Sequence, residues 1–367
     1  MATVVVTGAA GFLGQHLVRE LNKHGDRFAR LRLVDKDRFS RILDYTVTVD
    51  TSVFRADLAD DETDWSFLVD CDAVFHAAGQ KFDWTLYPDE ARYWRNNYQA
   101  TNRLLEAMRS HCPRARLVFV SDAMANLEPV DTFCHPESVN CEAPVDSRYL
   151  LGEYGRSKFY AELLVTGPNK GVHIQNVVVR PTVLYGEGDS TVVPSALQLA
   201  SSHGGRLPQV TCASGGGFQM TYAGNAAACL VQAERQLRAR PELFDREVFY
   251  CVESGQVVNY YQFVRPYVEA AGFRVSAPVN YYVGRAATLL WEATSYAANW
   301  LRPCWRPFAD EPSSRAVLAV SSLCFGFQAV KARLFLDFLP PYDREAAMEE
   351  SLRWWTHSLA SVSRREG

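Results

Sequence analysis

Val4-Val5-Val6-Thr7-Gly8-Ala9-Ala10-Gly11-Phe12-Leu13-Gly14 is the stretch that decides the fold of this 367-residue chain. A β-branched run, a glycine-rich turn and a helical spacing of apolar residues predict a strand, a tight turn and a helix. Gly8 permits the turn, Gly11 lets the backbone approach a pyrophosphate, and Gly14 lets the helix pack against its strand. An incidental glycine-rich turn is the alternative, but the flanking strand and helix favour a dinucleotide site at the helix N-terminus.

The next strand, residues 31–34, ends in Asp35, about twenty residues beyond the last glycine. A carboxylate at that position can accept hydrogen bonds from the adenosine ribose and repels a 2′-phosphate. Asp35 therefore favours NAD over NADP. Lys36 and Arg38 follow directly and would soften this preference.

Strand and helix patterns alternate along the first half of the chain. Strands are predicted at 53–58, 73–79, 117–120 and 177–181, and a helix at 97–108. This alternation predicts an α/β fold with a doubly wound, Rossmann-type parallel sheet. We expect residues 1–180 to form the NAD-binding domain, with 213–255 returning to it. Residues 181–212 and 256–367 then form a smaller substrate-binding region, and a loop is expected at 133–148.

Composition narrows the classes of function. Hydrophobic residues make up 48% of the chain and the net charge is −4, so no basic surface is predicted to bind nucleic acid. The nine cysteines, from Cys71 to Cys324, include no C-x-x-C pair, which argues against a zinc site or a disulfide framework. The chain starts with a strand pattern rather than a signal peptide, so we expect an intracellular protein that is not secreted.

Tyr154 and Lys158 are four residues apart at the start of a helical pattern. This spacing places both polar groups on one face of a helix. A nearby ammonium favours the phenolate, which would let the tyrosine act as a base nearer neutral pH. By itself such a pair also arises by chance, as a solvated lysine beside an amphipathic tyrosine.

Residues 278–307 are rich in tyrosine, tryptophan and leucine, but Arg285 and Glu292 lie near the middle. The unbroken apolar run is too short for a transmembrane helix. Two alternatives remain from periodicity alone. The segment forms a helix in a membrane interface, anchored by its tryptophans, or it caps the substrate pocket.

Taken in order, these motifs resemble the extended short-chain dehydrogenases/reductases. Four further stretches narrow the resemblance to the 3β-hydroxysteroid dehydrogenase family, and together the motifs span about 4–355. These stretches are Arg180-Pro181-Thr182-Val183-Leu184-Tyr185-Gly186-Glu187-Gly188, Tyr222-Ala223-Gly224-Asn225, Trp300-Leu301-Arg302-Pro303 and Pro340-Pro341-Tyr342.

The resemblance implies roles for individual residues. Tyr154 would take the proton of a secondary alcohol while hydride passes to NAD, and Lys158 would bind the nicotinamide ribose and lower the pKa of Tyr154. The implied substrate is a steroid or sterol 3β-hydroxyl, and the family implies peripheral association with a membrane such as the endoplasmic reticulum. A homodimer is one option for the oligomeric state, which the sequence leaves open. The remaining cofactor contacts are expected from Gly8, Gly11, Phe12, Leu13, Gly14, Asp35, Asp57, Leu58, Ala77, Ala78 and Pro181.

The chain departs from the family pattern after the fifth strand. The family usually carries Thr-Ser-Ser there, followed by a turn containing Glu, and an ungapped alignment puts Asp122 at the catalytic serine and Ser121 one place earlier. An ionised Asp122 would raise the pKa of Tyr154. Three accounts remain open. Asp122 is held protonated and donates the hydrogen bond, a one-residue shift brings Ser121 into the position of the catalytic serine, or the protein is catalytically weak or silent. The missing Glu leaves Δ5–Δ4 isomerisation open.

The sequence therefore predicts an NAD-dependent enzyme that oxidises the 3β-hydroxyl of a steroid or sterol. One alternative is an enzyme acting on another hydrophobic alcohol or on a sugar nucleotide. Another is an NAD-binding scaffold without turnover, which Asp122 motivates.

Overall fold

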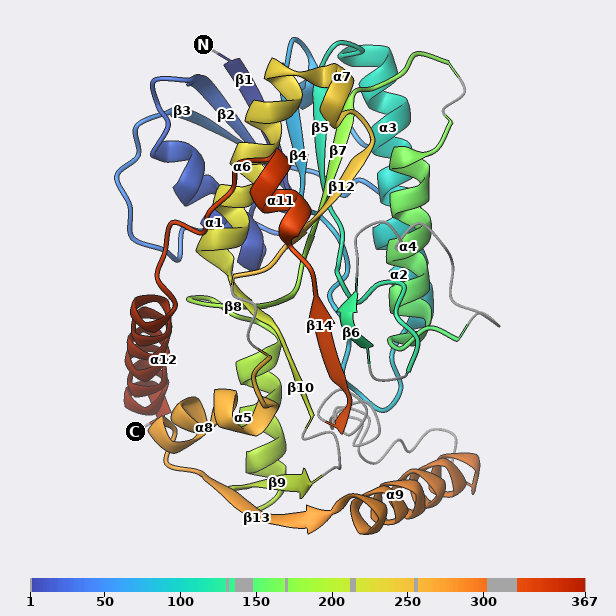
Figure 1. The fold of residues 1–367 in the computed structure, drawn as a ribbon, viewed down its shortest axis with the longest axis vertical. Coiled ribbons are helices and arrows are strands. Elements are labelled where there is room, and N and C mark those ends of the chain that lie inside the picture. Colours follow the sequence, from blue (N-terminus) through green and yellow to red (C-terminus); the bar gives the residue numbers. More distant parts are fainter. Residues whose placement is uncertain are drawn as a thin grey trace.

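A seven-stranded parallel sheet organises the structure (Figure 1). The computed structural model describes residues 2–129, 132–135, 148–168, 171–211, 216–253, 257–301 and 322–366. The predicted α/β fold with a doubly wound Rossmann-type sheet is confirmed. In spatial order the strands are β12 (Glu247–Cys251), β7 (Asn176–Pro181), β5 (Arg116–Val120), β4 (Ala73–His76), β1 (Ala2–Thr7), β2 (Phe28–Asp35) and β3 (Asp50–Arg55).

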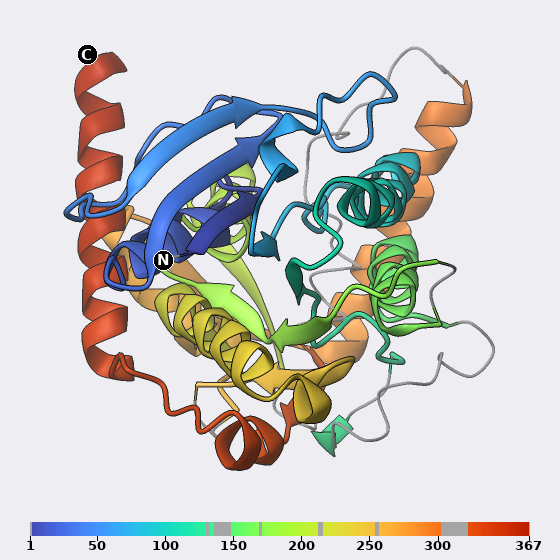
Figure 2. The same ribbon diagram turned by 90° about the horizontal axis from the view of Figure 1, so that it is seen from above.

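Both faces of the sheet are covered by helices because its strands are apolar on both faces. Val4 and Val6 pack with α1 (Phe12–Asn22) and α6 (Ala223–Ala239), whereas Val5 packs with α3 (Ala100–His111) and α4 (Gly152–Thr166). Figure 2 shows the sheet between these two helix layers. From β1 the chain adds β2 and β3 on one side, and then crosses to β4 on the other side of β1. The strand order therefore reverses between β1 and β4, and such a reversal is where α/β folds bind ligands.

Several predicted boundaries shift. The strand expected at 53–58 ends at Arg55, and the strand expected at 73–79 ends at His76. The helix expected at 97–108 begins as a π-helical stretch, Trp94–Gln99, and continues as α3. Shorter helices are η1 (Ser66–Leu68), α2 (Glu90–Tyr93) and α7 (Pro241–Phe244).

A second group of elements lies beyond the carboxyl ends of the strands (Figure 1). Its apolar side chains form a separate core, in which α5 (Val192–Ser202) packs on α8 (Tyr260–Ala270). β9 (Arg206–Thr211) pairs with β13 (Arg274–Asn280), which leads into α9 (Tyr281–Leu301). The other small sheets pair β8 (Val183–Tyr185) with β11 (Met220–Tyr222), and β14 (Cys324–Phe327) with β10 (Gly217–Phe218) and β6 (Thr132–His135).

β6 corrects one expectation, because its residues fall at the start of the stretch expected to be a loop, 133–148. A strand forms there because β14 offers it a pairing partner. Residues 136–147 of that stretch lie outside the described part of the chain. The division into two regions stays a prediction, although β12 does join the main sheet.

The last part of the chain touches both groups. α11 (Val330–Phe335) packs on β12, and Ala332 and Leu336 belong to the core of the main sheet. α12 (Arg344–Glu366) packs on α8 instead. The C-terminal segment therefore packs on both groups of elements.

Candidate active site

One cavity of about 660 Å³ lies at the carboxyl ends of the central strands. Every site residue predicted from the sequence lines it, although these residues come from seven separate parts of the chain. The lining includes Gly8, Gly11, Phe12, Leu13, Gly14, Asp35, Asp57, Leu58, Ala77, Ala78, Ser121, Asp122, Tyr154, Lys158 and Pro181.

The glycine turn has the geometry that a pyrophosphate requires. Gly8 has φ of +73°, a conformation that favours glycine. A Cβ added to Gly14 would lie 2.0 Å from the carbonyl oxygen of Gly8, so only glycine lets α1 start this close to β1. No side chain caps α1, and its first N–H groups have no partner within the helix. These N–H groups can bind the phosphates of a dinucleotide.

Two carboxylates line the end of the cavity that is expected to hold the ribose and adenine. The Oδ2 atom of Asp35 accepts a hydrogen bond from the N–H of Ala10 at 2.9 Å, which fixes the carboxylate beside the glycine turn. Asp57 forms an ion pair with Arg95 at 2.9 Å. Burial by itself would raise the pKa of Asp57, but hydrogen bonds from the Ala59 N–H and from Arg95 outweigh burial and lower it. The residues at this end thus fit the adenosine half of a dinucleotide.

Tyr154 and Asp122 are joined directly. The Tyr154 hydroxyl donates a hydrogen bond of 2.7 Å to the Oδ2 atom of Asp122. Burial, followed by the charge of Asp122 and this hydrogen bond, raises the pKa of Tyr154 well above its usual value. Ser121 does not take this place, because its Oγ is buried and makes no hydrogen bond within the described residues.

Lys158 lies in the same cavity but donates to the carbonyl oxygen of Val120, at 2.9 Å. Burial lowers the pKa of Lys158, and the charges of Asp122 and Glu162 work in the opposite direction. The net shift of the Tyr154 pKa is upward, opposite to the lowering expected from Lys158 and in the direction expected from an ionised Asp122. Burial and the adjacent Asp122 carboxylate raise that pKa instead.

A chain of buried polar groups positions α4 against the loop after β4. Asn97 Nδ2 donates to Ser157 Oγ at 2.9 Å, and Asn97 Oδ1 accepts from the N–H of Gln80 at 2.7 Å. His76 is fully buried between Thr7 and Thr101, and burial, aided by the charge of Lys158, lowers its pKa to about 3. His76 therefore acts as a neutral packing residue.

The model of the 3-beta hydroxysteroid dehydrogenase/isomerase family matches residues 5–282. The chain belongs to this family. It is 26% identical to the human 3 beta-hydroxysteroid dehydrogenase type 7, covering 95% of this chain and 94% of the relative. It is 24% identical to the decarboxylating sterol-4-alpha-carboxylate 3-dehydrogenase of Candida albicans, covering 98% and 99%. A 2-alkyl-3-oxoalkanoate reductase of Stenotrophomonas maltophilia is 25% identical, covering 95% and 97%.

The fold also matches solved structures. A UDP-glucuronic acid 4-epimerase from Bacillus cereus, solved in complex with NAD, superimposes with a TM-score of 0.67 at 17% identity, covering 97% of this chain and 99% of that one. At this identity the likeness establishes a shared fold and leaves the substrate undetermined.

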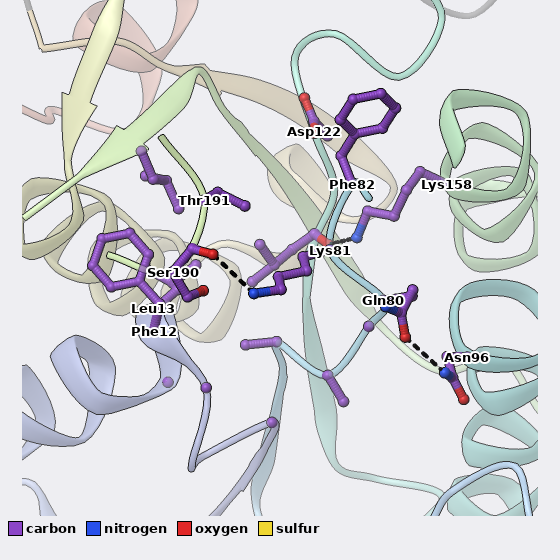
Figure 3. A pocket seen from close by; sticks show the side chains of 18 of the residues that line it. Phe12, Leu13, Gln80, Lys81, Phe82, Asn96, Asp122, Lys158, Ser190 and Thr191 are labelled. Atoms are coloured by element: carbon purple, nitrogen blue, oxygen red, sulfur yellow. Dashed lines mark hydrogen bonds between the residues drawn. The ribbon is translucent and has the colours of Figure 1, made fainter. Parts of the chain in front are cut away.

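In this 3-beta hydroxysteroid dehydrogenase/isomerase family member, the part of the cavity beside Tyr154 is apolar. Phe82 packs edge-on against Tyr154, with ring centroids 5.5 Å apart, and Trp84 packs edge-on against Phe82. Figure 3 shows Phe82 close to Asp122 and Lys158. Sequence reasoning missed Phe82 and Trp84 because they lie in an irregular loop without periodicity. The other apolar lining residues include Met124, Leu151, Val192, Phe218 and Tyr260.

Lys81 was also missed. It extends from the loop after β4, and its ammonium donates to the carbonyl oxygen of Ser190 at 2.8 Å (Figure 3). This hydrogen bond links two loops that line the same cavity as the glycine turn. Lys81 therefore places a positive charge at the cavity that is expected to hold the pyrophosphate.

We expect Lys81→Met to raise the Kd for NAD about twofold to fivefold, because partly exposed charge pairs contribute up to about 1 kcal/mol. Isothermal titration calorimetry measures this change. Arg92→Met is the matched control, because Arg92 forms an exposed ion pair with Asp89 and is not among the residues lining the cavity. Equal Kd values for Lys81→Met and the wild type would show that Lys81 only connects the two loops.

Proposed function

We propose that this protein oxidises the 3β-hydroxyl of a steroid or sterol to the ketone. The protein is an NAD-dependent oxidoreductase of the 3-beta hydroxysteroid dehydrogenase/isomerase family. NAD, when bound, supplies the hydride acceptor. The observation that carries the proposal is the apolar and aromatic lining around the Tyr154 hydroxyl, which suits a rigid hydrocarbon with one polar oxygen.

The charges of the cavity support an apolar substrate over a sugar nucleotide. Among the described lining residues, the cations are Lys36, Arg38, Lys81 and Lys158. Lys36 and Arg38 follow the ribose-binding Asp35, whereas Lys81 and Lys158 donate to backbone carbonyl oxygens. The described lining residues beside Tyr154 include no arginine. A sugar nucleotide would bring a second diphosphate to this part of the cavity, and arginine is the side chain best suited to bind it.

In the proposed reaction, Tyr154 orients the substrate oxygen and accepts its proton. Phe82 and Tyr93 pack edge-on against the Tyr154 ring, both at 5.5 Å, and hold the hydroxyl in one position. Lys158, anchored at Val120, would hydrogen-bond the nicotinamide ribose. Asp57 and Asp35 would orient the adenosine half.

The experiment is a screen for NAD reduction across pregnenolone-type, C27 and 4-carboxysterol substrates, followed by NADH absorbance. A sugar nucleotide and a long-chain 3-hydroxy acid serve as competing substrates. Turnover of at least one 3β-hydroxysteroid is expected. If calorimetry shows NAD binding and only a competing substrate turns over, the steroid assignment is wrong.

Helix α9 carries the second proposal. Its large apolar side chains face solvent, whereas its buried face is polar. Tyr282, Leu290 and Trp300 are 76%, 68% and 81% exposed, while Glu292 and Ser295 are buried. At 100° per residue, the exposed large apolar side chains fall on one arc of the helix that contains no charged residue, and the exposed Arg285 borders this arc. This polarity is the reverse of what a helix packed only on a protein core needs.

We propose that the exposed face of α9 lies in a membrane interface, where aromatic side chains are favoured. No described helix is long and apolar enough to span a bilayer, so the proposed contact is peripheral. Because α9 contacts β9 and β13, it would hold the substrate-binding side of the protein at the lipid surface. A sterol could then reach the cavity from the bilayer.

We expect the double variant Leu290→Ser and Trp300→Ser to lose most binding to phosphatidylcholine vesicles in flotation assays, because about 2 kcal/mol or more of apolar burial disappears. Val53→Ser with Val172→Ser is the matched control, because both valines are exposed elsewhere. Equal flotation of the two variants would refute the interfacial role. Loss of a dimer in sedimentation, without loss of flotation, would assign the face to a second copy of the chain.

A further inference from the structure

The Asp122 carboxylate is held in place by its own turn. Its Oδ1 atom accepts a hydrogen bond from the N–H of Met124 at 2.8 Å, and its Oδ2 atom accepts the Tyr154 hydroxyl at 2.7 Å. The flanking backbone is fixed too, since the Ala123 N–H donates to the Pro181 carbonyl oxygen at 3.0 Å. Asp122 is thus rigidly aimed at the phenol.

The Tyr154 oxygen and Asp122 Oδ2 are 2.7 Å apart, within the range in which a proton can pass between two oxygens. This geometry leaves Oδ2 as the carboxylate oxygen that can exchange a proton with the phenol, because Oδ1 accepts from the Met124 N–H. It also places Asp122, not Ser121, next to the phenol. A serine at this position would bind the substrate oxygen but could not take a proton at neutral pH.

We infer that Asp122 is the terminal proton acceptor of the oxidation, receiving the proton that Tyr154 gives up as Tyr154 takes the substrate's hydroxyl proton. This inference rests on the proposed function of the site. In the step, the carbinol C–H bond breaks and its hydride, with both electrons, passes to NAD. The substrate O–H bond breaks as its proton binds the Tyr154 oxygen. The former Tyr154 proton binds Asp122 Oδ2, and solvent later removes it.

The relay solves a difficulty that the site otherwise has. Burial raises the pKa of Tyr154, so a free phenolate would form only in alkaline solution. A tyrosine that passes its proton to a carboxylate never needs to exist as a free phenolate. Lys158 supports the relay because its positive charge attracts the Asp122 carboxylate. The same attraction acts to raise the pKa of Lys158, against the lowering effect of burial.

Two replacements of Asp122 test the relay. Asp122→Asn keeps the size of the side chain and an acceptor oxygen for Tyr154, but removes the proton-accepting group. Asp122→Ser restores the residue usual in the family. We expect both variants to lose about 10² or more in kcat at pH 7, because a positioned base contributes about 10²–10⁴. Their remaining activity should rise with pH into the alkaline range, where Tyr154 itself ionises.

Wild-type kcat should instead stay level from neutral pH into the alkaline range. A rise in kcat at pH 7 for Asp122→Ser would overturn the relay and show that Asp122 suppresses turnover. Wild-type kcat and an unchanged pH profile for Asp122→Asn would overturn it as well.

A measurement without substrate separates this inference from the proposed function. Difference infrared spectra of the NAD complex report whether Asp122 is protonated, with Asp122→Asn as the blank. The relay predicts no protonated-carboxyl band from Asp122 at pH 7, and such a band would overturn it. Failure of all steroids in the screen would overturn the steroid assignment, whereas the kinetic test of Asp122 can use any alcohol that turns over.

Discussion

Tyr154→Phe should lower kcat about 10³-fold for whichever alcohol turns over, while the Kd for NAD stays within about twofold of the wild type. The phenylalanine ring keeps the edge-on contacts with Phe82 and Tyr93, so the wall of the cavity is preserved. Only the hydroxyl that contacts Asp122 is lost. General acid–base groups contribute about 10²–10⁴ to rate, and in the proposed reaction Tyr154 carries the hydroxyl that transfers the proton. Steady-state kinetics and calorimetry measure the two quantities.

Tyr160→Phe is the matched control, because Tyr160 lies on the same helix but is more than one-third exposed and does not line the cavity. This variant should keep the wild-type kcat. If Tyr154→Phe retained more than about a tenth of the wild-type kcat, the proton chemistry would have to lie elsewhere. A large rise in Kd for the same variant would indicate a binding role for the hydroxyl instead.

The cofactor half of the site was predictable because its signals are local. Gly8 and Gly14 are dictated by backbone geometry within a single strand, turn and helix, so their spacing alone identifies the turn. Asp35 follows from the length of one such unit. Alternation of strands and helices then requires a parallel sheet whose carboxyl ends lie together. Asp122 and Tyr154 meet because Asp122 directly follows β5, and Tyr154 lies in the first turn of α4, the helix that precedes the neighbouring strand β7.

The substrate half was less predictable because its residues come together only in three dimensions. Phe82 and Lys81 lie in an irregular loop, where no period marks the side chains that face the cavity. For α9, periodicity identifies an apolar face but does not say whether protein, lipid or solvent meets that face. The direction of the Tyr154 pKa shift also required the structure. In the sequence, Lys158 is a reason to expect a lower pKa and Asp122 a reason to expect a higher one, and burial together with the direct contact to Asp122 raises it.

Glu162→Gln should lower the free energy of unfolding by about 3–5 kcal/mol, the largest stability effect that we expect from a conservative change. Glu162 on α4 receives two hydrogen bonds from the Arg180 guanidinium on β7, one of them 2.8 Å long. Arg180 is 0% and Glu162 3% exposed. Burial by itself would lower the pKa of Arg180, but Glu162 outweighs burial and raises it, so the pair stays charged. A neutral glutamine leaves the arginine charge uncompensated in the interior.

Denaturant unfolding measures this loss, and Glu350→Gln provides the matched control. Glu350 pairs with Arg353 on the surface of α12, where both side chains are more than half exposed, so its replacement should cost less than about 1 kcal/mol. The double variant Glu162→Leu with Arg180→Met should recover most of the lost stability, because it removes both charges and fills the space with apolar atoms. If Glu162→Gln cost no more than Glu350→Gln, the pair would not hold α4 to the sheet. Because Glu162 lies one turn beyond Lys158, that result would also require another explanation for how the Tyr154 helix is positioned.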